Sequence, residues 1–405
     1  MRDNAPVRVF VEPSGYRDRN AGDAAMLAVA LRRLRERWPE AAITIHTQEP
    51  AAIARLDPQA TPLAPDGSLG WNAEGHFDLL PDAFRALRRH APRLMRFLAK
   101  IALRASHRNP RAIDAYLAAI RNADLVIVTG AGSLNDCFRQ HASRVLETIE
   151  LAIDSGAVTI LMGQGLGPMS DPALRRRAAA VLPRVDFIAL REGVASVALL
   201  QSMGVDAERM TVSGDDAIAL AYAAHPPALG NTIGVNMRRS PYAGVDDAYL
   251  LAIGRALRAR NAPLVAIPIS TQPGEEDLAT IRFLLGDSVE GSLERLPECR
   301  IVVAGSYHAA VMALAMGISV VTVARSPYYL DKFRGLAAQF GDGCRVVTSL
   351  DDLDAAIEAA WNEAPHVRAS LLEAARRQIA SSEAAYRHAF DLLETRGTMT
   401  ARICS

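Results

Sequence analysis

The sequence contains little cysteine, and its four cysteines are scattered along 405 residues. No two of them have the CxxC spacing of a zinc or redox motif, so we expect neither a disulfide framework nor a metal site. Free thiols favour a reducing, cytoplasmic compartment.

Net charge is also lacking, because 45 Lys and Arg balance 45 Asp and Glu. This balance argues against a nucleic-acid partner, which would call for a broad basic surface.

Long apolar runs are missing as well. No stretch approaches the roughly 18 apolar residues that a membrane span needs, and the first residues do not have the pattern of a signal peptide. Half of all residues are nevertheless apolar, which predicts a packed protein. At this length two domains are expected.

Lysine is rarer still, since Lys100 and Lys332 are the only two. Every other fixed positive charge is an arginine, so one arginine is weak evidence for a site. A lysine at position 332 is the more informative choice.

Short apolar stretches alternate with helical patterns along the chain, which predicts parallel sheets covered by helices. The expected strands are residues 7–11, 43–46, 125–129, 159–162, 187–190 and 209–212, followed by 233–236, 264–268, 301–304 and 319–323. Two prolines and a glycine mark a break at 225–231. We therefore predict an α/β protein with two Rossmann-like domains, 1–225 and 226–405, whose parallel sheets face a central cleft. The second domain is expected to end in helices.

A basic helical insertion is expected at about 80–120. Residues 85–111 contain nine Lys and Arg and no Asp or Glu, with apolar residues at helical spacing. One interpretation is a solvated helix face. The other is a surface that contacts acidic lipid headgroups, which would make the protein peripheral to the membrane.

Three glycine-bearing stretches follow predicted strands and should meet at the cleft, because ligands bind at the carboxyl ends of parallel strands. Glycines let a backbone approach a ligand, and helix-start amides favour anions. None of the stretches is a dinucleotide fingerprint or a P-loop. The candidates are Asn20, Gly22 and Asp23 in the first stretch, Gly132 and Ser133 in the second, and Gln164 and Gly165 in the third. Asp23 is either a catalytic carboxylate or a helix cap.

Further candidates follow four other predicted strands. Arg191 could clamp a carboxylate or phosphate, and Asp215 could orient a sugar hydroxyl. His308 stands at a strand-to-helix junction, where an imidazole is placed for proton transfer. The remaining candidates for substrate binding are Ser306, Tyr307, Arg325 and Lys332.

Taken in order, these pieces resemble the polysaccharide pyruvyl transferase family. The matching stretches are 20–23, 130–134, 163–168, 191–192, 214–216 and 306–309, within residues 8–345. The resemblance implies a GT-B-like pair of domains, with the acceptor on the first and the donor on the second. It also implies transfer of the enolpyruvyl group of phosphoenolpyruvate, a co-substrate rather than a cofactor, onto two hydroxyls of a sugar, with His308 as acid/base.

One position departs from the family pattern. Members often have an Arg two places before the motif His, and this chain has Ser306 there. The replacements that we consider are Arg325, Lys332, and Arg238 or Arg239.

Three functions follow. The first is pyruvyl transfer onto a glycan or lipid-linked saccharide in the synthesis of exopolysaccharide or cell-surface polymer. The second is glycosyl transfer from a nucleotide sugar, which would need a nucleobase pocket. The third is a non-catalytic relative that binds a carbohydrate or a partner protein without a donor.

Overall fold

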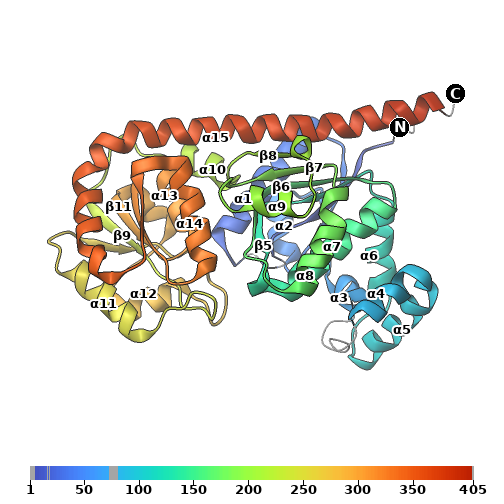
Figure 1. Ribbon diagram of the computed structural model, residues 1–405, viewed down its shortest axis with the longest axis horizontal. Coiled ribbons are helices and arrows are strands. Elements are labelled where there is room, and N and C mark those ends of the chain that lie inside the picture. The colour runs from blue at the N-terminus through green and yellow to red at the C-terminus, as the bar shows by residue number, and fades with distance from the viewer. Residues whose placement is uncertain (1–4, 16, 18, 73–80, 404–405) are drawn as a thin grey trace.

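The computed structural model describes residues 5–15, 17, 19–72 and 81–403, without the side chains of 81–85 and 397–403. Tyr16 and Asp18 of the first candidate loop therefore lie outside the described residues. Two lobes, each a parallel sheet with helices on its faces, lie side by side (Figure 1). We call residues 5–223 the first lobe and residues 232–347 the second lobe.

The sheet of the first lobe has the order β3-β2-β1-β4-β6-β7-β8, and β5 pairs with β6. Its strands are β1 Arg8–Glu12, β2 Ala42–His46, β3 Thr61–Leu63, β4 Leu125–Val128, β5 Ala131–Leu134, β6 Val158–Leu166, β7 Phe187–Leu190 and β8 Met210–Val212. The central strand β4 is apolar and buried throughout, as expected of a parallel strand with helices on both faces.

The sheet of the second lobe has the order β10-β9-β11-β12-β13. Its strands are β9 Thr232–Asn236, β10 Leu264–Ala266, β11 Cys299–Ala304, β12 Ser319–Val323 and β13 Cys344–Val347. The fully buried helix α13 Tyr307–Ala315 follows β11 directly, so its first turn lies at the carboxyl edge of this sheet.

Helices connect the strands of both lobes. In the first lobe they are α1 Ala21–Arg37, α2 Pro50–Leu56, α3 Asp66–Asn72, α4 Pro81–His90, α5 Pro92–Ala105, α6 Ala112–Arg121, α7 Arg139–Asp154, α8 Pro172–Val181, α9 Ser196–Ser202 and α10 Ala217–Ala223. The second lobe has α11 Asp247–Arg258, α12 Asp277–Leu285, α13 and α14 Pro327–Phe340. Within the described part of the chain, none of the helices is both long and apolar enough to cross a membrane.

All ten expected strands are present, with ends shifted by a few residues. Two of the glycine stretches, which we expected to follow strands, are themselves parts of strands, and this corrects the expectation. Residues 131–134 form β5, and β6 continues past an irregularity near Gly163 to pair with β5. Gly163 has a φ of 58°, a left-handed conformation that glycine adopts readily.

The C-terminal helices expected after residue 351 are one helix, α15 Leu353–Ile403. It begins against the second lobe and runs along both lobes (Figure 1). Four of its later residues, Ala385, Tyr386, Ala389 and Phe390, belong to the hydrophobic core under the first sheet. The end of the chain therefore covers the first lobe and ties the two lobes together.

A second connection between the lobes lies beside α1. The amide of Ala21 donates to the carbonyl of Ile269 at 2.9 Å, and the amide of Thr271 donates to the carbonyl of Arg19 at 2.9 Å. The start of α1 is thus hydrogen-bonded to the loop after β10, which fixes the spacing of the lobes at this point.

Candidate active site

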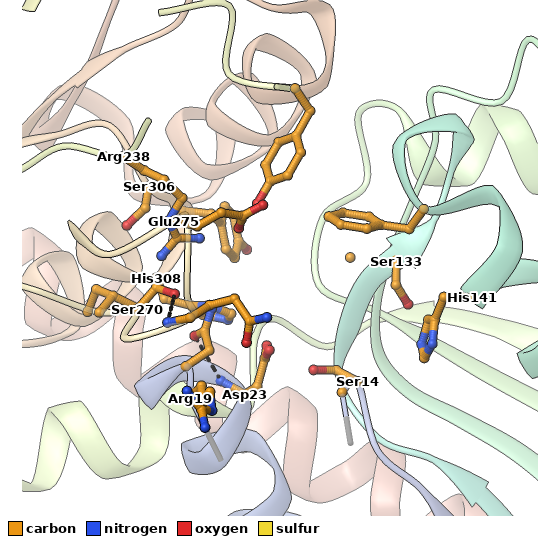
Figure 2. A pocket seen from close by; sticks show the side chains of 18 of the residues that line it. Ser14, Arg19, Asp23, Ser133, His141, Arg238, Ser270, Glu275, Ser306 and His308 are labelled. Atoms are coloured by element: carbon orange, nitrogen blue, oxygen red, sulfur yellow. Dashed lines mark hydrogen bonds between the residues drawn. The ribbon is translucent and has the colours of Figure 1, made fainter. Parts of the chain in front are cut away.

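A cavity of about 570 Å³ lies between the lobes and is lined by residues of both. Figure 2 shows Arg238, Ser306 and His308 on one side of it and Ser133 and His141 on the other. Nine of the predicted site residues line this cavity: Asn20, Asp23, Gly132, Ser133, Arg191, Ser306, Tyr307, His308 and Lys332. The loops that sequence reasoning placed at one cleft do meet there.

His308 is the second residue of α13 and lies at the junction of the lobes. Its side chain packs against the backbone of Gly22 so closely that a Cβ at position 22 would overlap the ring. Nε2 lies 3.6 Å from Oδ2 of Asp215. Burial alone would raise the pKa of Asp215, but His308 and Arg191 outweigh it and hold this pKa below its ordinary value. An ionised Asp215 can orient the imidazole.

Arg191 is 1% exposed, yet it lines the cavity. Its Nη1 lies 3.6 Å from Oδ2 of Asp215, and its guanidinium carbon lies 4.0 Å from the centre of the Tyr307 ring. The backbone of Gly132 and Gly165 passes so close that a side chain at either position would overlap the guanidinium. These two glycines therefore make room for the arginine.

Lys332 of α14 approaches the same point from the second lobe. Its Nζ lies 3.6 Å from the centre of the Tyr328 ring and contacts the Tyr328 hydroxyl. Burial, together with the neighbouring Arg191 guanidinium, holds the pKa of Lys332 well below its ordinary value. The negative charge of an anion bound here would offset both the burial of Lys332 and its repulsion by Arg191.

Several buried polar atoms around this cluster have no hydrogen-bond partner among the described residues. They are Nε and Nη2 of Arg191, Oδ2 of Asp215, Oγ of Ser306, Oη of Tyr307 and Nε2 of His308. Buried polar groups are nearly always paired, and each unpaired group costs about 1–3 kcal/mol. A concentration of such atoms around one cluster indicates a site built for a polar, anionic ligand.

Five predicted residues do not line the cavity. Gly22 and Gly165 clear space for His308 and Arg191, and Asp215 lies behind both side chains. The amide nitrogen of Gln164 donates to the carbonyl oxygens of Thr129 and Met162, so this side chain supports the backbone of the cavity wall.

Arg325 is the clearest correction. Its Nη1 lies 3.0 Å from Oδ2 of Asp246, and its guanidinium lies over the Tyr249 ring, away from the cavity. Arg239 likewise pairs with Asp247 at the surface. Neither arginine can take the place of the guanidinium that Ser306 has replaced.

Arg238 does line the cavity, but its charge is already engaged. Nε and Nη2 donate to the carboxylate of Asp277 at 2.8 and 3.2 Å. Asp277 also accepts hydrogen bonds from the amide of Asn236 and from the backbone of Ile269 and Ser270. This network holds the second-lobe wall of the cavity in place.

The lining of the cavity also contains residues that sequence reasoning missed. They include Ser14, Arg17, Arg19, Gln48, Phe138, His141, Tyr242, Ser270, Gln272 and Glu275. Phe138 of the first lobe and Tyr242 of the second lie 5.2 Å apart between ring centres, and the Tyr242 hydroxyl donates to Glu275. Gln48 and Gln272 follow predicted strands, which is the signal that could have found them.

Among the described residues, no three His, Cys, Asp or Glu side chains are grouped so that they could hold a metal ion.

The fold defines the class of protein: two facing lobes with a polar cavity between them form a GT-B fold. HepE of Anabaena in complex with UDP has a TM-score of 0.55 and 14% identity, covering 96% of this chain and 100% of that chain. A glycosyltransferase from Rickettsia africae has a TM-score of 0.55 and 11% identity, covering 96% and 99%. A putative UDP-N-acetylglucosamine 2-epimerase from Listeria monocytogenes has a TM-score of 0.55 and 13% identity, covering 94% of each chain.

Within this fold, the chain belongs to the polysaccharide pyruvyl transferase family, whose model matches residues 20–327. It is thus a transferase of polysaccharide biosynthesis that acts on a saccharide acceptor. A comparison with curated proteins found no significant match.

Proposed function

We propose that the protein transfers the enolpyruvyl group of phosphoenolpyruvate onto two hydroxyls of a glycan, which forms a pyruvate ketal and releases phosphate. The observation that supports this most is the set of unpaired buried atoms around Arg191, Lys332 and His308. Phosphoenolpyruvate has a carboxylate and a phosphate within one small molecule. Two cations and an imidazole at the junction of the lobes match those charges.

Arg191 and Lys332 are the donor ligands in this proposal, and Ser306 contributes its hydroxyl. Arg191 comes from the first lobe, whereas Lys332, Ser306 and His308 come from the second. We therefore place the donor at the junction of the lobes rather than on the second lobe alone. Arg191, already unpaired at Nε and Nη2, takes the role of the missing family arginine.

The reaction needs one proton delivered and two removed. His308 gives a proton to the methylene carbon, which makes the neighbouring carbon electrophilic, and one sugar hydroxyl adds there. The second hydroxyl then displaces phosphate. One hydroxyl proton restores His308 and the other leaves with phosphate. Asp23, which lines the cavity from α1, is our candidate to accept the first hydroxyl proton and to pass it to the departing phosphate, while the second hydroxyl proton restores His308.

The rest of the cavity suits the saccharide. Phosphoenolpyruvate fills only a part of about 570 Å³, and the remaining lining combines aromatic rings with amides and carboxylates. Phe138 and Tyr242 offer faces on which a sugar ring can pack, and Gln272 and Glu275 offer partners for its hydroxyls. A lipid-linked saccharide on the cytoplasmic side of a membrane is the acceptor that we favour.

The test is phosphate release from phosphoenolpyruvate in the presence of saccharides with neighbouring hydroxyls, including lipid-linked ones, with mass spectrometry of the ketal. His308→Gln should lower turnover by about 10²–10⁴-fold, the range typical of a lost acid/base group. His366→Gln, at an exposed position of α15, is the matched control and should leave turnover unchanged. Full activity of His308→Gln would remove the proposed acid/base.

A further inference from the structure

Helix α5 of the basic insertion has two apolar faces. One contains Met95, Ala99 and Leu103, which are at most 3% exposed and pack in the hydrophobic core of the insertion. The other is exposed to solvent: Leu94 is 50% exposed, Phe97 60%, Leu98 41% and Ile101 45%. A helix that served only to cover the first lobe would need the first face alone.

The four exposed side chains form a single stripe, because positions i, i+3, i+4 and i+7 lie on one side of a helix. Across the described residues, ten large apolar side chains are exposed, and four of them are on this one helix. Scattered exposed apolar residues are normal, but such a contiguous stripe marks an interaction surface. We call Leu94, Phe97, Leu98 and Ile101 the α5 stripe.

Positive charge borders the α5 stripe. Arg93 and Arg104 are exposed beside it, and Arg89 and Arg111 are exposed at the ends of the insertion. None of these four arginines has an ion-pair partner within the described part of the protein. Arg96 and Lys100 differ, because both pair with Asp114, at 2.6 and 2.7 Å. Among the described residues, the charge of these four arginines is therefore not neutralised.

The insertion is held firmly in its orientation. Glu147 of α7 is buried and accepts a hydrogen bond from the Trp71 indole of α3 at 3.3 Å. It also lies 3.0 Å from Arg88 of α4 and 3.0 Å from Arg177 of α8. The α5 stripe is thus presented by a helix fixed to the first lobe. In Figure 1 the α3–α5 region lies on the side of this lobe opposite α15.

We propose that the α5 stripe and its flanking arginines dock the protein on the surface of an anionic lipid bilayer. Apolar side chains enter the boundary between headgroups and acyl chains, while arginines at the edge meet lipid phosphates. The positive charge of the flanking arginines favours one partner for the α5 stripe. A neutral apolar face would suit a second copy of the chain, but two such copies would bring their unpaired arginines together. An anionic headgroup layer neutralises them.

The proposal stands on α5 and is independent of the reaction assigned to the cavity. If both hold, docking keeps the enzyme on the surface where lipid-linked saccharides are found. If pyruvyl transfer fails its own test, binding to vesicles would still test the docking proposal.

The experiment is flotation of the full chain with vesicles of phosphatidylcholine alone or mixed equally with phosphatidylglycerol. We expect binding to the anionic vesicles only, and a loss of binding as salt is raised. The double variant Arg93→Glu/Arg104→Glu should bind at least about 25-fold more weakly, from about fivefold per arginine at an anionic surface. Phe97→Ser should bind about tenfold more weakly, because it loses the insertion of one aromatic ring.

Matched controls come from other surfaces. Leu251→Ser changes an exposed apolar residue of α11, and Arg376→Glu an exposed arginine of α15; both should bind like the unchanged chain. Equal binding of all variants, or binding that is insensitive to headgroup charge, would overturn the proposal. So would concentration-dependent dimerisation that Phe97→Ser abolishes without vesicle binding, because the α5 stripe would then be a contact between copies.

Discussion

Two buried arginine–aspartate pairs lie at the cavity, and they are built differently. Arg238 makes two hydrogen bonds to Asp277, whose carboxylate also accepts from Asn236 and two backbone amides. Arg191 and Asp215 are just as buried, but their nearest atoms stay 3.6 Å apart. Hydrogen-bonding atoms of both remain unpaired within the described residues.

This difference distinguishes a pair that stabilises the fold from a pair that is available to bind a ligand. Burying a charge is costly, and a pair such as Arg238–Asp277 recovers that cost through hydrogen bonds within the protein. The Arg191–Asp215 pair leaves the cost only partly recovered, so the remaining stabilisation has to come from a ligand. The neighbouring carboxylate follows the first pattern: Asp216 accepts hydrogen bonds from Ser382 and Tyr386 and thereby fastens α15.

The largest expected effect is on the paired cluster. Asp277→Ala leaves Arg238 buried without its partner, and should lower the free energy of unfolding by about 3–5 kcal/mol. Asp215→Asn keeps the shape of its side chain and should lower this free energy far less. Denaturant unfolding followed by circular dichroism compares the two. Equal losses would mean that both pairs are structural.

The second effect is on donor binding. Here Arg191, rather than the fully paired Arg238–Asp277 cluster, is expected to matter most. Arg191→Gln should weaken phosphoenolpyruvate binding by about 10–100-fold, corresponding to a lost charged hydrogen-bonding partner of about 1.5–3 kcal/mol. Its melting temperature should not fall, because the removed guanidinium was incompletely paired. Calorimetric titration measures the affinity, and Arg239→Gln, at a surface ion pair, is the control. An unchanged affinity would assign Arg191 to the acceptor.

The third effect is a pH dependence. The pKa of Lys332 is lowered in the free protein, and a bound anion raises it, so binding takes up a proton between the two values. Affinity for phosphoenolpyruvate should therefore fall by up to about tenfold per pH unit across that interval, measured above neutral pH where the phosphate is ionised. Lys332→Met should remove this slope. The same slope in the variant would place the titration elsewhere.

The smallest effect tests whether the absence of a side chain at Gly132 makes room for Arg191 and Lys332. A Cβ at position 132 would overlap the Arg191 guanidinium and lie 2.7 Å from Nζ of Lys332. Both neighbours are ends of flexible side chains, so Gly132→Ala should leave stability nearly unchanged and weaken phosphoenolpyruvate binding about two- to fivefold. Gly15→Ala, where no atom of the described residues other than its chain neighbours lies within 4 Å of the added carbon, is the control. Equal affinities would show that Arg191 and Lys332 are not held in place by this contact.

Much of this could be predicted from the sequence, because strand-forming apolar runs and the loops after them are local patterns. The convergence of Asp23, Gly132, Arg191, His308 and Lys332 on one cavity followed from parallel-sheet geometry alone. The strands β3, β5 and β13 were missed; β3 contains Pro62 and β5 contains Gly132, residue types that are depleted in strands.

Contacts between residues far apart in the sequence could not be predicted from local patterns. Arg325 and Arg191 look alike in the sequence, but Asp246 draws the first to the surface and two glycines admit the second to the cavity. The return of α15 over the first lobe depends on Asp216 meeting Ser382 and Tyr386, contacts that span more than 160 positions.

The most direct test of the proposed donor is calorimetric titration of the unchanged chain with phosphoenolpyruvate and, separately, with a UDP-sugar. We expect stoichiometric binding of phosphoenolpyruvate that Arg191→Gln weakens, and no binding of the nucleotide sugar. Tight binding of the UDP-sugar without binding of phosphoenolpyruvate would contradict it and identify the cavity as a glycosyltransferase donor site.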